Sequence, residues 1–202
     1  MSNTPIAYII FNRPRHTQQT FAAIRAQQPA TLLIVADGPR PGHPTDAQNC
    51  AATRAIVEQI DWPCKVLRNY SDVNLGCKRR VSSGLDWVFE QVETAIVLED
   101  DCIPHDDFFP YCDALLERYA NDERVWVVTG NNFQQGKKRG EAAYYFSKFN
   151  HCWGWATWRD RWQNSYDVEL KKWPAIRDGG WLEDILGNKK EAASWTGVFE
   201  DT

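Results

Sequence analysis

The chain has 202 residues, of which 43% are hydrophobic and 25% are charged, and its formal net charge is −4 at pH 7. These values are typical of a soluble globular protein and allow one domain with a substantial core. The acidic balance argues against a nucleic-acid partner or an anionic membrane surface, because binding to either needs a basic face.

No segment of the chain predicts a membrane span or an export signal. Every apolar run is shorter than the roughly 18 residues that cross a bilayer. The first five residues, Met1–Pro5, lack the charged and apolar regions of a signal peptide. We therefore expect a cytoplasmic location, which includes the inner face of a membrane. The six scattered cysteines form no Cys-x-x-Cys pair, which favours reduced thiols over a structural zinc site.

The first half of the chain alternates two kinds of hydrophobic pattern. Short apolar runs predict buried strands, and apolar spacings of three and four residues predict helices. The expected strands are 6–11, 32–36, 64–67, 94–98 and 125–128, and the expected helices are 17–26, 46–60, 77–91 and 106–119. Apolar strands that alternate with helices predict an α/β fold, with a mostly parallel central sheet flanked by helices on both faces.

The second half is less regular and richer in aromatic residues. Eight of the ten tryptophans lie from position 126 onward, which suits either a bulky core or a surface for sugar rings. Three of them, Trp155, Trp158 and Trp162, have the i, i+3, i+7 spacing of one packed helix face. The expected elements are a strand at 144–146 and helices at 153–162 and 168–173.

Three acidic residues, Glu99, Asp100 and Asp101, directly follow the apolar strand 94–98. In open α/β sheets, ligands bind at the carboxyl ends of the strands. Adjacent carboxylates repel one another, so a hard cation such as Mg²⁺ or Mn²⁺ would stabilise them, and such a cation commonly bridges to phosphate oxygens. The triplet therefore predicts a metal site used with a phosphorylated substrate. A solvated acidic turn before the next helix is the alternative.

A series of short signatures surrounds this triplet. In chain order they are Phe11-Asn-Arg-Pro14, Ala36-Asp-Gly-Pro39, Asn74-Leu-Gly76, the triplet itself, Asp107-Phe-Phe-Pro-Tyr111 and Cys152-Trp-Gly-Trp-Ala-Thr-Trp158. The series covers roughly residues 5–175 and resembles bacterial family-2-like glycosyltransferases. It is also similar to the catalytic domain of N-acetylglucosaminyltransferase I. The resemblance implies the GT-A fold of nucleotide-diphospho-sugar transferases, with an acidic motif of the DXD kind.

The resemblance implies that three residues contact the nucleotide. Arg13 would approach it with a guanidinium suited to phosphate or a base edge. Asp37 would accept a hydrogen bond from the base, and Arg80 matches a position beside the nucleotide, where a similar enzyme has histidine. Each residue also has a structural interpretation. Arg13 would be a surface residue before a helix, Asp37 a turn former, and Arg80 part of a solvated helix face together with Arg79.

The same resemblance implies roles around the sugar. Glu99 and Asp100 would hold ribose and sugar hydroxyls, and Asp101 would bind the metal together with the diphosphate. Trp153 and Gly154 would form a turn over the donor sugar on the acceptor side, where glycine permits close approach of the backbone.

The implied function is that of an inverting, metal-dependent glycosyltransferase. A carboxylate would deprotonate an acceptor hydroxyl, which attacks the anomeric carbon as the nucleoside diphosphate leaves. The donor would be a nucleoside-diphosphate sugar, with uridine diphosphate favoured, the cofactor Mn²⁺ or Mg²⁺, and the acceptor a glycan, lipid or protein. Asp184 and Asp201 are candidates for the base, although neither has a closely matching sequence context, and the base could also lie beyond Thr202.

The resemblance also sets the expected organisation. We expect one glycosyltransferase domain over residues 1–202, with a nucleotide-binding half at 1–128 and an acceptor and sugar half at 129–202. The abrupt end at Thr202 suggests that the domain is incomplete at its C-terminus. Two other functions remain open: a non-catalytic module that binds nucleotide-sugar or carbohydrate, and a sugar-1-phosphate nucleotidyltransferase. The second is disfavoured because Phe11–Arg15 contains no glycine.

Overall fold

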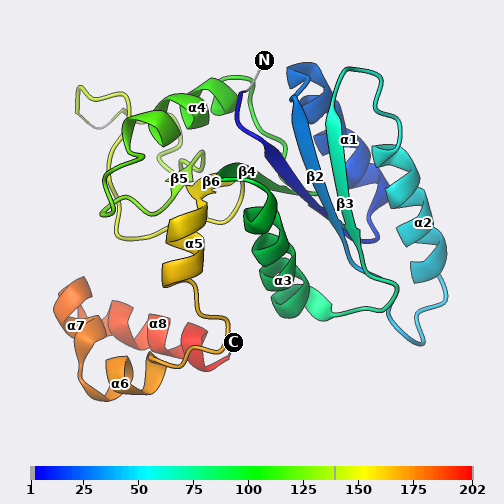
Figure 1. Ribbon diagram of the computed structural model, residues 1–202. Helices are drawn as coiled ribbons and strands as arrows, with labels where there is room; N and C mark the ends of the chain where they lie inside the picture. Colours follow the sequence, from blue (N-terminus) through cyan, green and yellow to red (C-terminus); the bar gives the residue numbers. More distant parts are fainter. Residues whose placement is uncertain (1–2, 139, 202) are drawn as a thin grey trace. The chain divides into compact units, whose positions relative to one another are not determined.

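The computed structural model describes residues 3–138 and 140–201 (Figure 1). Met1 and Ser2, on which the expected lack of a signal peptide partly rests, lie outside the described residues. The chain divides into two compact units, one ending at Tyr166 and the other beginning at Asp167. In the part of the chain that is described, no helix is long and apolar enough to cross a membrane.

The first unit is built on a six-stranded sheet whose strands follow the order β3-β2-β1-β4-β6-β5. Strands β1 to β4 are parallel to one another, and β6 runs antiparallel to both β4 and β5. The strands are β1 (Ile6–Ile10), β2 (Thr31–Ala36), β3 (Lys65–Tyr70), β4 (Thr94–Glu99), β5 (Val128–Thr129) and β6 (Trp155–Trp158). The predicted mostly parallel sheet is therefore confirmed.

Helices cover both faces of this sheet, as Figure 1 shows. One face packs against α1, α2 and α4, which contribute Phe21, Val57 and Phe109 to the larger core. The other packs against α3 and α5, which contribute Phe89 and Trp162. The helices are α1 (Pro14–Gln27), α2 (Asp46–Val57), α3 (Gly76–Gln91), α4 (Phe108–Arg118) and α5 (Arg159–Ser165). The arrangement confirms the predicted α/β fold, in which helices flank a mostly parallel central sheet on both faces.

The carboxyl ends of the four parallel strands meet at one edge, called the carboxyl edge here. The register places Ile6 of β1 opposite Leu32 of β2 and Ile96 of β4, so these strands run level with one another. Just beyond their ends, the Asp37 amide donates to the Ile10 carbonyl at 3.3 Å. The loops that follow β1, β2, β3 and β4 therefore emerge side by side, as expected for a binding site in such a sheet.

Two predictions for residues 129–166 are wrong. Residues 153–162 do not form one helix, because Trp155 to Trp158 form β6 and α5 begins only at Arg159. Side chains alternate along a strand, so Trp155 and Trp158 face opposite sides of the sheet. Trp158 joins the larger core, whereas Trp155 packs beside Trp162 with ring centroids 6.2 Å apart. Residues 144–146 form no strand.

The second unit contains three helices, α6 (Trp173–Asp178), α7 (Trp181–Leu186) and α8 (Lys189–Glu200). Trp173 packs on Phe199 with ring centroids 4.7 Å apart, which joins α6 to α8. Asn188 caps α8 by accepting a hydrogen bond from the Lys190 amide at 2.9 Å. The helix predicted at 168–173 is wrong, because α6 begins where that prediction ends.

The contact between α3 and β2 depends on the absence of a side chain at Gly84. A Cβ atom placed there would clash with Cγ1 of Val35, whose β-branched side chain cannot easily rotate away. We expect Gly84→Ala to lower the free energy of unfolding by about 1–3 kcal/mol, as overpacked cores do. Thermal or urea unfolding measures this. The penalty should shrink in a Val35→Ala background, and equal penalties in both backgrounds would contradict the proposed clash.

Candidate functional site

The acidic triplet lies at the carboxyl edge, at the end of β4. Glu99 is the last residue of the strand, and Asp100 and Asp101 form the turn after it. Asp100 is buried, with 2% of its surface exposed, while Asp101 is exposed and Glu99 is intermediate. The hydroxyl of Thr20 in α1 donates to the Asp100 carbonyl at 2.9 Å, which fixes the turn against the helix.

Arg13, in the turn after β1, bridges two residues of the triplet. Its Nη2 lies 2.5 Å from Oδ1 of Asp100, and its Nη1 lies 2.8 Å from Oδ2 of Asp101. Burial alone would lower the pKa of Arg13, but the charges of Asp100 and Asp101 outweigh it, so the pKa is raised. The structure thus brings together three residues that the sequence analysis assigned to one site.

One guanidinium does not balance three carboxylates. Burial, and then the charges of Asp101 and Asp100, raise the pKa of Glu99. Burial also raises the pKa of Asp100, although Arg13 opposes the shift. Both carboxylates are therefore harder to keep charged than exposed ones, and a bound cation would favour their charged forms.

The donor set suits a hard cation that keeps other ligands. Within residues 3–138 and 140–201, no group of three or more His, Cys, Asp or Glu side chains could hold a metal ion by itself. Mg²⁺ and Mn²⁺ commonly take one or two carboxylates and complete their shell with water and phosphate oxygens. Asp101, whose side chain is 40% exposed, is the member of the triplet most open to such an ion.

Asp37 lies at the carboxyl end of β2, and the chain itself uses its carboxylate. Oδ1 accepts from the amides of Gly38 and Leu75, both at 2.9 Å. Oδ2 accepts from Nδ2 of Asn74 at 2.9 Å and from the Gly76 amide at 3.1 Å. A carboxylate has about four acceptor positions, so a hydrogen bond from a nucleobase to Asp37 would have to displace one of these donors.

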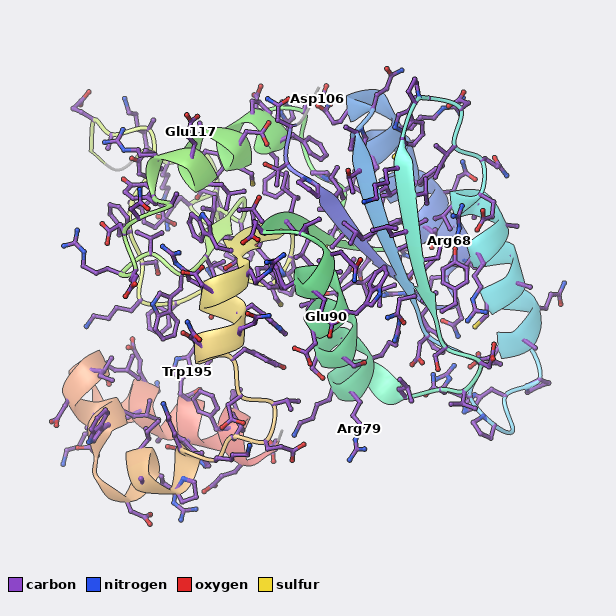
Figure 2. The ribbon with its side chains drawn as sticks, in the orientation of Figure 1. Arg68, Arg79, Glu90, Asp106, Glu117 and Trp195 are labelled. Carbon is purple, nitrogen blue, oxygen red and sulfur yellow. The ribbon has the colours of Figure 1, made fainter. Side chains whose placement is uncertain are left out.

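Arg80 also has a structural partner. It is buried, and its Nη2 donates to the backbone carbonyl of Asn69 at 2.5 Å and to the Asn69 side chain at 2.8 Å. Burial lowers the pKa of Arg80. The solvated helix face suggested as an alternative is therefore wrong for Arg80. Arg79 does fit it, because its side chain extends from α3 into solvent (Figure 2).

Trp153 and Gly154 reach the carboxyl edge because β6 is antiparallel to β4. With Trp155 opposite Val97, the residues before β6 run back toward the triplet. Gly154 has φ +77°, a left-handed conformation that glycine adopts without strain. Its carbonyl accepts from the Gly130 amide at 3.2 Å. Trp153 is 57% exposed, so its ring is available to a ligand.

The two candidate bases belong to the second unit. Asp184 lies in α7, and Asp201 follows the last residue of α8. The acidic triplet belongs to the first unit. The assignment of either aspartate as general base therefore stays a prediction.

Two supporting residues were missed by the sequence analysis. Thr20 fixes the turn that bears Asp100, and Asn74 donates to Asp37 and to the Gly38 carbonyl, both at 2.9 Å. Asn74 belongs to the Asn-Leu-Gly signature, so the motif was visible although its partner was not. Thr20 gave no sequence signal, because a threonine within a helix is ordinary.

Comparison with known proteins yields structural likeness alone. No protein-family model and no curated protein matches the chain. Among solved structures, the chain is similar to 4-diphosphocytidyl-2C-methyl-D-erythritol synthase from Anaerococcus prevotii DSM 20548. The TM-score is 0.50 at 10% identity, over 83% of this chain and 80% of that one. At this identity the likeness concerns the fold.

Proposed function

We propose that the carboxyl edge binds a nucleoside-diphosphate sugar with a divalent cation, and that the chain is an inverting glycosyltransferase. The observation that supports this most directly is the acidic triplet. Three carboxylates lie at the end of a buried central strand, and a single arginine pairs with two of them. Such a concentration of negative charge is electrostatically unfavourable unless a bound cation offsets the repulsion among the carboxylates.

Each residue of the triplet has a distinct chemical task in this proposal. Asp101 would hold Mn²⁺ or Mg²⁺, which when bound supplies positive charge for the leaving diphosphate. Arg13 would turn its exposed side toward the phosphates while Asp100, buried beneath it, keeps its orientation. Glu99 would accept hydrogen bonds from hydroxyls of the ribose or the sugar. Asp37 would act indirectly, by holding the Asn74–Gly76 loop beside the nucleotide.

The acceptor side is proposed to lie at Trp153 and Gly154. An exposed indole provides a flat apolar surface for a sugar ring, and the glycine lets backbone approach closely. The acceptor would be a glycan, lipid or protein hydroxyl, activated by a carboxylate within hydrogen-bond reach. Asp184 and Asp201 remain the proposed candidates for that base. We also propose the division into a nucleotide-binding half at 1–128 and an acceptor half at 129–202.

Nucleotidyl transfer is a second candidate function. The structural likeness to a protein named for synthesis of a diphosphocytidyl compound favours it. The turn Phe11–Arg15 speaks against it, because it lacks the glycines that would let the backbone wrap a triphosphate. A third candidate, a module that binds the nucleotide-sugar without turnover, shares the same carboxyl edge.

The products formed distinguish these functions. The chain would be incubated with Mn²⁺ and uridine- or guanosine-diphosphate sugars, and separately with nucleoside triphosphates and sugar 1-phosphates. In the first set we expect release of nucleoside diphosphate, with the sugar passing to water in the absence of an acceptor, and EDTA should stop this release. In the second set we expect no pyrophosphate. Pyrophosphate release would establish nucleotidyl transfer instead. Metal-dependent binding by calorimetry with neither product would indicate the binding module, and no binding at all would overturn the proposal.

A further inference from the structure

One buried carboxylate fastens the loop after β2 to the turn after β1. Asp46 is 2% exposed and accepts from Nδ2 of Asn12 at 2.8 Å. It also accepts from Nε and Nη2 of Arg40 at 2.7 and 3.0 Å. The hydrogen bonds from Arg40 hold the pKa of Asp46 well below its usual range, so the carboxylate stays charged. We call Asn12, Arg40 and Asp46 the clasp.

The clasp holds the Arg40 guanidinium at the surface of the carboxyl edge. The Arg40 side chain is 44% exposed, and its Cζ lies 5.5 Å from the centroid of the Phe11 ring. Asp46 takes up Nε and Nη2, and no described residue accepts a hydrogen bond from Nη1. A planar group fixed through two of its nitrogens loses little further freedom when a ligand binds to it.

The other arginines near the end of β2 are less exposed than Arg40. Arg80 is buried against Asn69, and Nη2 of Arg54 donates to the Asp37 carbonyl at 3.1 Å. The Asp37 carboxylate is itself filled by four donors of the chain. A nucleobase at this end of the edge would therefore need another polar group. Arg40, three residues after Asp37 on the same loop, has an unused donor at an exposed position.

We propose that Arg40 contacts the nucleobase of the nucleotide bound at the carboxyl edge, and that Asp46 is its positioning residue. The inference rests on the proposed nucleotide site. A base can stack its flat ring on a guanidinium plane, and its carbonyl oxygens or ring nitrogens accept hydrogen bonds from a fixed donor such as Nη1.

Calorimetry of four ligands tests this assignment. Uridine, cytidine and guanosine diphosphates and inorganic pyrophosphate would each be titrated with Mn²⁺ into the unchanged chain and into Arg40→Ala, Arg40→Lys and Asp46→Asn. For the diphosphate that binds best, we expect Arg40→Ala to raise Kd about tenfold. Arg40→Lys should raise Kd nearly as much, because an ammonium has neither the plane nor the paired nitrogens. The Kd of pyrophosphate should be unchanged.

Asp46→Asn should weaken nucleotide binding in the same direction while leaving pyrophosphate binding unchanged, since it releases Arg40. Because Asp46 is buried, this variant could be destabilised, and the two Arg40 variants test the proposal without it. Arg124→Ala is the matched control. Arg124 forms a similar two-nitrogen pair with Asp122, at 2.8 and 2.7 Å, in the segment before β5 rather than at the carboxyl edge.

Three outcomes would overturn the inference. Unchanged nucleotide affinity in Arg40→Ala would remove Arg40 from the site. Equal weakening of nucleotide and pyrophosphate would assign Arg40 to the phosphates rather than to the base. Failure of the unchanged chain to bind any of the four ligands would overturn the proposed function, and this inference with it. Titration of the unchanged chain therefore distinguishes a failure of the proposed function from a failure of the Arg40 assignment.

Discussion

Replacement of Asp101 by alanine is expected to abolish metal-dependent nucleotide binding while leaving the fold intact. Asp101 is the exposed member of the triplet, so removing its carboxylate takes away the protein's most accessible metal ligand. Loss of groups that merely support a metal ligand already lowers affinity 10–100-fold, so we expect a loss of about a hundredfold or more. Calorimetry with Mn²⁺, and again with EDTA, measures it.

Stability should change little in this variant. The substitution breaks the ion pair between Asp101 and Arg13, but both side chains are partly exposed, and such pairs contribute under about 1 kcal/mol. Asp107→Ala is the matched control, because Asp107 is an exposed carboxylate in the next turn of chain. Binding that falls equally in both variants, or a parallel fall in melting temperature for Asp101→Ala, would contradict a role in metal binding.

Replacement of Asp37 by asparagine is expected to destabilise the first unit strongly. The carboxylate accepts from the amides of Gly38, Leu75 and Gly76 and from the Asn74 side chain. The side-chain NH2 group of asparagine would then face some of these N–H groups, so donor would meet donor. A buried donor without a partner costs about 1–3 kcal/mol, so the loss should reach about 3 kcal/mol. For a unit of this size, the melting temperature should fall by roughly 6–12 °C.

The same variant distinguishes two functions for Asp37. If it holds the Asn74–Gly76 loop, stability and nucleotide affinity should fall together. If its main task were to bind a base, affinity would fall while the melting temperature stayed unchanged. Asp72→Asn serves as the control, because Asp72 is an exposed aspartate on the same loop that does not bond to Asn74–Gly76 in the described residues.

The central strands could be predicted because they are buried on both faces. Every residue of β1 is buried, so its sequence is a continuous apolar run. The edge strand β3 was only half predicted. Its end at Arg68–Tyr70 pairs with β2 but is partly exposed, so its polar residues gave no apolar signal.

The sixth strand could not be predicted from local pattern. Trp155 and Trp158 have helical spacing, yet β6 pairs with β4, whose sequence lies about sixty residues earlier. The unpaired backbone at that edge of β4 outweighs the local helical preference of the tryptophan segment. Similarly, the donors to the Asp37 carboxylate, apart from Gly38, lie 37 or more positions away, so its turn signature could be recognised while its partners could not.

For the acidic triplet and Arg13, the sequence predicted the location well. The strand rule placed Glu99–Asp101 at the carboxyl edge, and the turn after β1 placed Arg13 at the same edge. The ion pairs between Arg13 and the two aspartates were not predicted, because side-chain pairing between the two loops depends on the register of β1 against β4.

The hydrogen bond between Gly130 and Gly154 closes the intervening segment into a loop with fixed ends. Once its ends are joined, the free energy of closing a loop rises only slowly with its length. Insertions or deletions at the exposed residues 135–138 should therefore leave the sheet and the triplet in place. The fold thus has a surface loop of variable length beside the proposed acceptor side. Changes in this loop could select new acceptors, in evolution or by engineering, while the proposed donor site at the carboxyl edge is kept.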